Sequence, residues 1–288
     1  MNHEIRPLAA GLYLVATPIG SARDITLRAL DILASCDVIA AEDTRTARKL
    51  MEIHGIPLGK RPVVAFHDHS GAGAVDRLVA AIAAGQSVAC VSEAGTPLIA
   101  DPGYELALAV QAAGLAVTAA PGASALLAAL AVAGLPTDRF AFLGFLSPAA
   151  VQRRTQLAEL RDLPFTLVIY ESPKRVHDLL SAGCEVLGEG RAAVVCRELT
   201  KKFEEVSRGT LASLSEAFDG RTVKGEIVVL IGRAGAEVIA DGDVEQALRE
   251  AMTTMRVKDA ATAVAGALGL PRRQVYQTAL AMNQDDDE

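Results

Sequence analysis

The first half of this sequence repeats one constraining pattern: short apolar, strand-like segments stop abruptly in loops of small residues. The segment Ser87–Val91 runs into residues 92–103, where glycines and prolines forbid a continuing strand or an immediate helix. Residues 11–16 and 116–119 end in the same way. Helix-like segments separate these strands, so the pattern predicts α/β layers.

The three small-residue loops are candidates for one ligand site. In open α/β sheets, ligands bind beyond the carboxyl ends of the strands. If these strands are parallel and adjacent, their loops line a shared cleft. An ordinary strand-to-helix connection explains any one loop equally well, but the recurrence favours the cleft. The chain contains neither Gly-x-Gly-x-x-Gly nor a Walker-type Gly-Lys-Ser/Thr, which disfavours a nicotinamide-binding domain and a nucleoside triphosphatase.

Composition narrows the class of protein. With 288 residues, of which 51% are hydrophobic and 22% charged, the chain is long enough for about two packed domains. The four cysteines are far apart and mostly in apolar segments, so we expect reduced, buried thiols and no metal site. Breaks at Gly20 and Pro121-Gly122 divide the apolar tracts, which disfavours a secretory signal or a membrane span. We therefore expect a soluble, cytoplasmic protein.

The net charge of −7 at first argues against a polyanionic partner. The middle third of the chain, however, is not acidic, and its basic residues could form a local basic face: Arg153, Arg154, Lys174, Arg175, Lys201 and Lys202. Paired charges on a solvated surface are the alternative explanation of each residue. Charge therefore permits a nucleic-acid partner without requiring one.

The chain divides into three predicted parts. Gly134-Leu135-Pro136 follows an alanine-rich helix and indicates a stop and a hinge, after which strands and helices alternate again. We expect an N-terminal α/β domain (1–122), a C-terminal α/β domain (123–235) and a helical unit (240–284).

The sequence of the helical unit resembles a helix-turn-helix motif. Residues 269–271 form a glycine- and proline-containing break, and the next helix opens with Arg272 and Arg273. A small bundle whose charges face solvent is the alternative that we favour, because basic residues are few here.

Polar groups follow three of the predicted strands. Glu42-Asp43-Thr44-Arg45 opens a helix, and a helix cap explains Asp43 or Thr44 but not the whole group. His67-Asp68-His69 offers histidines for proton transfer, phosphate contact or metal binding, but alternation along a strand points Asp68 away from the two histidines and disfavours a metal site. Residues 170–175 end another strand with polar side chains.

These motifs together resemble one bacterial family. They occur along nearly the whole chain in the family's order: Leu14–Gly20, Ala40–Arg45, Phe66–His69, Val91–Gly103, Pro121–Ser124, Gly134–Pro136, Phe142–Phe145, Tyr170–Pro173 and Lys224–Glu226. The resemblance is to the ribosomal RNA small-subunit methyltransferases of the tetrapyrrole methylase superfamily, which 2′-O-methylate a cytidine in the decoding region of 16S ribosomal RNA. Glu93 departs from the pattern, since the family usually has Asp there.

The resemblance implies a fold, a cofactor and site residues. It implies a two-domain, non-Rossmann α/β methyltransferase that binds S-adenosylmethionine between its domains, uses no metal, forms a homodimer and acts on 16S ribosomal RNA in the small ribosomal subunit. The implied cofactor contacts are Pro18, Gly20, Thr96, Ile99, Ala123, Ser124, Tyr170 and Gly225.

The acceptor chemistry is assigned as a hypothesis. The catalytic candidates are Asp43 and Glu42, either of which would take the ribose proton, and the adjacent Arg45. Arg45, His67 and His69 would hold phosphate or ribose. Two other functions stay open: a methyltransferase of the same fold that acts on a corrin-like tetrapyrrole or a protein side chain, and a noncatalytic RNA-binding module.

Overall fold

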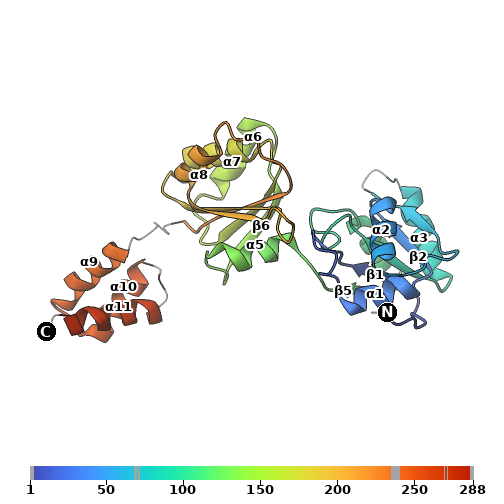
Figure 1. The fold of residues 1–288 in the computed structure, drawn as a ribbon, viewed down its shortest axis with the longest axis horizontal. Coiled ribbons are helices and arrows are strands. Elements are labelled where there is room, and N and C mark those ends of the chain that lie inside the picture. Colours follow the sequence, from blue (N-terminus) through green and yellow to red (C-terminus); the bar gives the residue numbers. More distant parts are fainter. Residues whose placement is uncertain are drawn as a thin grey trace.

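The computed structural model describes residues 3–67, 70, 72–234, 241–268, 270 and 272–285. These residues form two α/β units joined by a short connection, followed by a separate group of helices (Figure 1). The α/β class expected from the sequence is confirmed, and the predicted strands and helices lie within a few residues of the observed ones.

The first unit is a parallel sheet covered by helices on both faces. Its elements are β1 (Gly11–Val15), α1 (Leu27–Ser35), β2 (Val38–Ala41), α2 (Thr44–Ile53), β3 (Val63–Ala65), α3 (Ala72–Ala83), β4 (Ser87–Val91), α4 (Tyr104–Ala112) and β5 (Val117–Ala120). The strand order is β3-β2-β4-β1-β5. The central strands β2 and β4 are fully buried, as expected of parallel strands with helices on both sides.

This strand order places a topological switch point between β1 and β4. The chain leaves β1 toward β2 on one side, whereas it leaves β4 toward β5 on the other side. A crevice opens at the carboxyl ends of such a pair, and ligands of open α/β sheets bind there. The loops that follow β1 and β4 are two of the three small-residue loops recognised in the sequence.

The second unit is a mixed sheet. Its elements are α5 (Ala125–Ala133), β6 (Phe140–Phe145), α6 (Ala150–Glu159), β7 (Thr166–Glu171), α7 (Val176–Leu187), β8 (Ala192–Arg197), β9 (Glu205–Thr210), α8 (Leu211–Phe218) and β10 (Ile227–Ile231). The order is β6-β7-β10-β8-β9, and only β6 and β7 pair in parallel. Helices α6, α7 and α8 lie on one side of this sheet and α5 lies on the other (Figure 1). Alternate residues of β7 and β10 pack against these two sets of helices.

The hinge predicted at Gly134-Leu135-Pro136 is wrong. Helix α5 buries Leu126, Ala129 and Leu130 against strands of the second sheet, so it belongs to the second unit. Gly134, with a φ of 76°, ends α5 in the left-handed region, and the chain then continues into β6 of the same unit. The connection between the units is therefore residues 121–124. The predicted limits of the three domains stay a proposal.

The helical unit has a core of its own. Helices α9 (Asp241–Met252), α10 (Val257–Leu268) and α11 (Arg272–Asp285) bury Leu248, Val275 and Ala279 among their neighbours. Within the described part of the chain, no helix combines the length and the apolar composition that crossing a bilayer requires.

Candidate functional site

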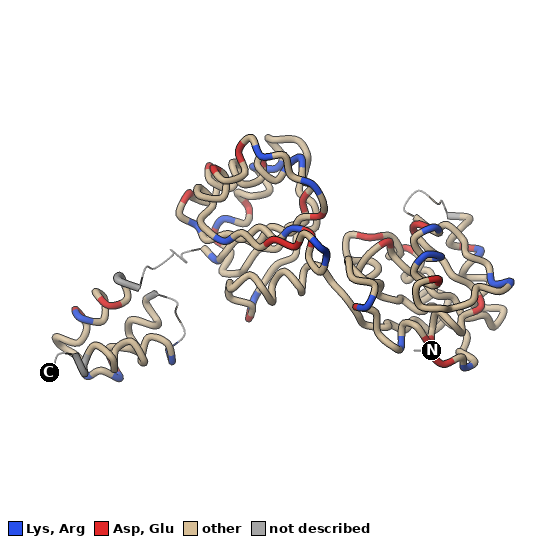
Figure 2. Tube along the Cα trace, viewed as in Figure 1, with Lys and Arg blue, Asp and Glu red and all other residues tan. Residues whose placement is uncertain are grey.

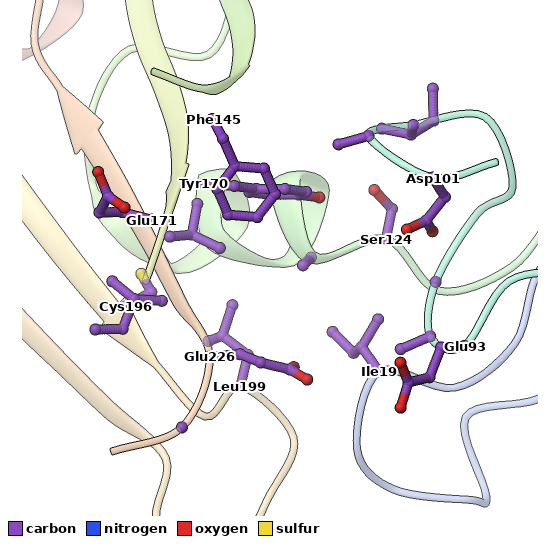
Figure 3. Close-up of a pocket in the computed structure, with 18 of the residues that line it drawn as sticks. Ile19, Glu93, Asp101, Ser124, Phe145, Tyr170, Glu171, Cys196, Leu199 and Glu226 are labelled. Atoms are coloured by element: carbon purple, nitrogen blue, oxygen red, sulfur yellow. The ribbon is translucent and has the colours of Figure 1, made fainter. Parts of the chain in front are cut away.

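A cavity of about 390 Å³ lies between the two α/β units (Figure 3). The first unit contributes residues of the loops after β1, β2, β4 and β5, and the second unit contributes the ends of β6, β7 and β8 and the start of β10. We call it the interdomain cavity. Its size lies within the range of pockets that enclose small-molecule ligands.

The loop after β4 forms one wall of this cavity and is held in an uncommon backbone shape. Leu98 and Ala100 have φ values of 74° and 60°, and Gly95 has 86°. Left-handed residues other than glycine are uncommon and cluster at functional sites. Paired hydrogen bonds between Thr17 and Gly95, with N–O distances of 2.8 and 3.0 Å, join this loop to the loop after β1.

Aromatic side chains of the second unit form the opposite wall. The Tyr170 ring lies edge-on to Phe142 and Phe145, with centroid distances of 4.8 and 5.8 Å. The Tyr170 hydroxyl accepts a hydrogen bond from Leu126 N at 3.2 Å, and burial raises the pKa of this phenol. Tyr170 therefore stays neutral at physiological pH and ties β7 to α5.

Gly225 closes the cavity beside β10, and any side chain there would be strained and would displace Glu198. Its φ is 93°, and a Cβ atom there would lie 2.3 Å from Cδ of Glu198. Oε1 of Glu198 accepts hydrogen bonds from Glu226 N at 2.9 Å and from Lys201 Nζ at 3.0 Å. These bonds hold the Glu198 side chain close to Gly225. The backbone of this segment therefore approaches the cavity as only glycine allows.

Carboxylates dominate the charged groups of the interdomain cavity: Glu42, Glu93, Asp101, Glu171 and Glu226. Figure 3 shows Glu93, Asp101 and Glu226 around its open centre. The Glu171 side chain is buried, and its Oε1 pairs with Arg175 Nη2 at 2.7 Å, whereas Oε2 has no hydrogen-bond partner among the described residues. Such a lining favours a ligand that carries positive charge or hydrogen-bond donors.

A second hollow of about 510 Å³ lies beside helix α2, and we call it the α2 hollow. It is lined by Thr17, Pro18, Gly20, Ala22, Asp43, Arg45, Thr46, Lys49, Leu50, Ile53 and Glu93. Asp43 caps α2 by accepting from Arg45 N at 2.7 Å, and it also accepts from Arg45 Nε and Nη2 at 3.2 and 2.9 Å. The Arg45 guanidinium, followed by the Arg45 backbone N–H, holds the pKa of Asp43 at about 2.

The structure brings the predicted cofactor residues together only in part. Thr96, Ile99, Ser124, Tyr170 and Gly225 line the interdomain cavity. Pro18 and Gly20 line the α2 hollow instead. The Ala123 carbonyl accepts a hydrogen bond from the Thr96 hydroxyl at 3.0 Å, so Ala123 supports the wall that Thr96 forms.

The residues predicted to act on the RNA are also divided, and they do not share one hollow. Glu42 lines the interdomain cavity, whereas Asp43 and Arg45 line the α2 hollow. His67 lies at the carboxyl end of the edge strand β3 and lines neither hollow; its N–H donates to Ser70 Oγ at 2.7 Å. His69 lies outside the described residues.

The local basic face considered for the middle third is largely paired. Acidic and basic residues are interspersed over both α/β units (Figure 2). Arg153, Arg154, Arg175 and Lys201 pair with acidic side chains: Asp178, Glu185, Glu171, Glu198 and Glu226. These four residues are therefore paired charges rather than parts of a free basic face.

Comparisons with known proteins identify the family. Residues 11–215 match the model of the tetrapyrrole (corrin/porphyrin) methylases, and residues 238–283 match that of the RsmI C-terminal HTH domain. A Mesorhizobium japonicum protein named ribosomal RNA small subunit methyltransferase I is 44% identical over 98% of this chain and 96% of its own length. The chain belongs to this methyltransferase family. A Xylella fastidiosa protein of the same name is 41% identical over 92% of this chain and 97% of its own.

The solved structures agree on the fold of this family member. Uroporphyrin-III C-methyltransferase from Thermus thermophilus, solved in complex with S-adenosyl homocysteine, is 20% identical with a TM-score of 0.55, covering 78% of this chain and 98% of its own. The family resemblance found in the sequence is confirmed, as is the tetrapyrrole-methylase-like fold.

Sequence reasoning missed several residues that line the interdomain cavity, among them Phe145, Glu171, Cys196 and Glu226. Phe145, Glu171 and Glu226 lie within motifs quoted for the resemblance, so their place at strand ends was a usable signal. Cys196 lies within a strand, where only the pairing of β8 with β10 shows which face it lines.

Proposed function

We propose that this protein transfers the methyl group of S-adenosylmethionine to the 2′-hydroxyl of a cytidine in the decoding region of 16S ribosomal RNA. The interdomain cavity at the switch point between β1 and β4 carries the proposal, together with relatives of nearly equal length that are named ribosomal RNA methyltransferases. The two observations agree, because a methyltransferase needs one enclosed pocket for the donor and an open approach for a large acceptor.

The residues of the interdomain cavity fit S-adenosylmethionine. Bound there, it supplies a sulfonium methyl group for direct transfer. The carboxylates around the open centre, among them Glu93, Asp101 and Glu226, favour its positive charges. Aromatic and small residues, with backbone groups near Thr96 and Gly225, suit an adenine ring. Pro18, Gly20 and Ala123 would then support the loops around the cofactor rather than line its cavity.

Glu42 is better placed than Asp43 to take the proton from the ribose hydroxyl. Glu42 lines the interdomain cavity, and its Oε2 accepts from Glu93 N at 3.2 Å. Asp43 has a pKa of about 2 and is occupied by Arg45, so it is a weak base. With S-adenosylmethionine bound, its methyl group would pass from sulfur to the ribose oxygen, and the Glu42 carboxylate would accept the hydroxyl proton. Asp43 then acts by positioning Arg45.

The proposed activity is tested with labelled S-adenosylmethionine and small ribosomal subunits from a strain that lacks the modification. We expect label on one cytidine ribose. Label on a small tetrapyrrole or on a protein, with none on the RNA, would overturn the proposal in favour of another reaction on this fold.

The base assignment has its own prediction. Glu42→Gln is expected to lower kcat about 100-fold while the affinity for S-adenosylmethionine stays within twofold, because general-base catalysis contributes about this factor. Asp43→Asn keeps an N-cap side chain and is the matched control; it is expected to act mainly on KM for the RNA particle. If Asp43→Asn shows the larger loss of kcat and Glu42→Gln little, the two roles are reversed.

We also propose that the protein works in the cytoplasm on the assembled ribosomal subunit and as a homodimer. Large apolar side chains exposed on helices support the dimer: Tyr104 and Leu108 lie four residues apart on α4, and Leu127 is exposed on α5. Light scattering at micromolar concentration would distinguish a dimer from a monomer, and a monomeric mass would contradict the dimer.

A further inference from the structure

The α2 hollow adjoins the interdomain cavity, but the cofactor proposed for that cavity does not fill it. Glu93 lines both the α2 hollow and the interdomain cavity. Glu93 is also joined to Glu42, since its N–H donates to Glu42 Oε2 at 3.2 Å. Ligands in the two hollows would therefore meet at Glu93, next to the carboxylate that we assign as the base.

The chemistry of the α2 hollow suits a nucleotide. Arg45 and Lys49 lie four residues apart on α2 and so share one face of the helix. Both side chains are exposed, by 90% and 65%. Leu50, Ile53 and Pro18 add apolar surface.

Both basic groups keep the capacity to bind an anion. Asp43 occupies Nε and Nη2 of Arg45, but a guanidinium has five N–H donors, so others stay available in a fixed orientation. Lys49 pairs with Glu52 at 3.1 Å, and both side chains are exposed, so this ion pair is weak and exchanges readily with phosphate. The acidic lining residues are Asp43, which Arg45 neutralises, and Glu93 at the junction.

We propose that the α2 hollow is the acceptor site, which takes one nucleotide swung out of a single-stranded RNA segment. Arg45 and Lys49 hold its phosphate, the apolar residues contact the base, and the ribose hydroxyl faces Glu93 and Glu42. Single-stranded RNA bases are recognised when they are splayed out, and phosphate contacts fix their position. The inference rests on the proposed RNA methyltransferase function and assigns the place where the RNA enters.

Two variants with a matched control test this site. Lys49→Glu places a negative charge in the α2 hollow, and Ile53→Trp fills part of it; Ile53 is 53% exposed, so the larger side chain leaves the core intact. Arg48→Glu makes the same charge change at another exposed position of the same helix, one that does not line the α2 hollow. Small ribosomal subunits lacking the modification are the probe, and each variant is assayed for subunit binding, transfer rate and calorimetric affinity for S-adenosylmethionine.

We expect Lys49→Glu and Ile53→Trp to raise KM for the subunits at least about tenfold, with the cofactor affinity within twofold of wild type. Arg48→Glu is expected to change KM less than about threefold. Equal effects of Lys49→Glu and Arg48→Glu would overturn the acceptor site, as would a loss of cofactor affinity in Ile53→Trp. Subunit binding by the wild type without label transfer to RNA would instead contradict the proposed function.

Discussion

At the scale of single residues, Gly225 is restricted both by its backbone conformation and by the side chain beside it. Its positive φ strains any other residue, and the Glu198 carboxylate fills the space that a Cβ atom would need. Gly220 provides a comparison, because its φ is 63° and nothing lies within 4 Å of the position of its Cβ. A comparison of substitutions at Gly225 and Gly220 therefore separates the effect of backbone strain from the effect of a steric clash.

Gly225→Ala is expected to lower the stability of the fold by about 2–3 kcal/mol and the affinity for S-adenosylmethionine about tenfold, because strain and displacement of Glu198 add. Gly220→Ala carries the strain alone, about 1 kcal/mol, and leaves the affinity unchanged. Urea unfolding and calorimetry measure the two quantities. Equal losses of affinity in both variants would show that contact with Glu198 has no part in the site.

Some site residues could be predicted from the sequence, and others could not. Tyr170 lies near the end of the apolar strand β7, and Thr96 and Ser124 lie in the loops after β4 and β5, so the place where each strand ends predicted their position at the cavity. Pro18 and Gly20 follow β1 in the same way but line the α2 hollow. The distinction depends on the Thr17–Gly95 hydrogen bonds, which turn the loop after β1, and no local sequence pattern encodes a pairing between residues so far apart.

At the scale of elements, Glu205 joins the parts of the second unit that support the cavity. It begins β9, pairs with Arg197 of β8 at 3.0 Å and with Arg221 after α8 at 2.7 Å. Arg197 Nη1 also donates to the Lys224 carbonyl at 3.3 Å, next to Gly225. Hydrogen bonds from Arg221, with a further contribution from Arg197, hold the pKa of Glu205 at about 2.

The pH dependence of stability follows from this pKa. The folded-state pKa of Glu205 lies below its ordinary value of 4.5, so the stabilisation is fully present above about pH 4.5 and is lost as the pH falls toward 2. Glu205→Gln is expected to cost about 1 kcal/mol at pH 7, and the difference from wild type should shrink at pH 3. Denaturant titrations at both pH values measure it. Glu216→Gln, exposed on α8, is the control, and an undiminished difference at pH 3 would contradict the ion-pair explanation.

The sequence predicted the elements better than their arrangement. Apolar runs and small-residue breaks located β1, β4 and β5 within a few residues, because burial and turn chemistry are local properties. The order of strands is not local. Strand β10 pairs with β7 and β8, which precede it by many residues, and apolar character alone does not distinguish one buried neighbour from another.

At the scale of the whole molecule, the helical unit is separable from the rest. Its core consists of residues from α9, α10 and α11, and the main packing contacts of these helices are with one another. Among the residues that the structure describes, those that line the interdomain cavity all lie before position 229. No described residue of the unit lines this cavity, and its match to the RsmI C-terminal HTH domain leads us to propose a role with the large substrate.

We propose that the helical unit contacts the RNA, so removal of residues 235–288 is expected to leave the affinity for S-adenosylmethionine within twofold and to raise KM for ribosomal subunits about tenfold or more. Calorimetry and the transfer assay measure the two effects, with circular dichroism as a check on folding. Unchanged KM for the subunits would show that the helical unit has no part in RNA recognition.

The strand order of the second sheet has a consequence for the synthesis of the protein. The first sheet is complete once residue 120 has left the ribosome, since β1 to β5 are consecutive in the chain. In the second sheet, β10 is made last but lies in the middle, between β7 and β8. Nascent chains that end between residues 210 and 227 therefore expose the unpaired edges of β7 and β8, so translation that stalls there yields a folded first half attached to an aggregation-prone second half.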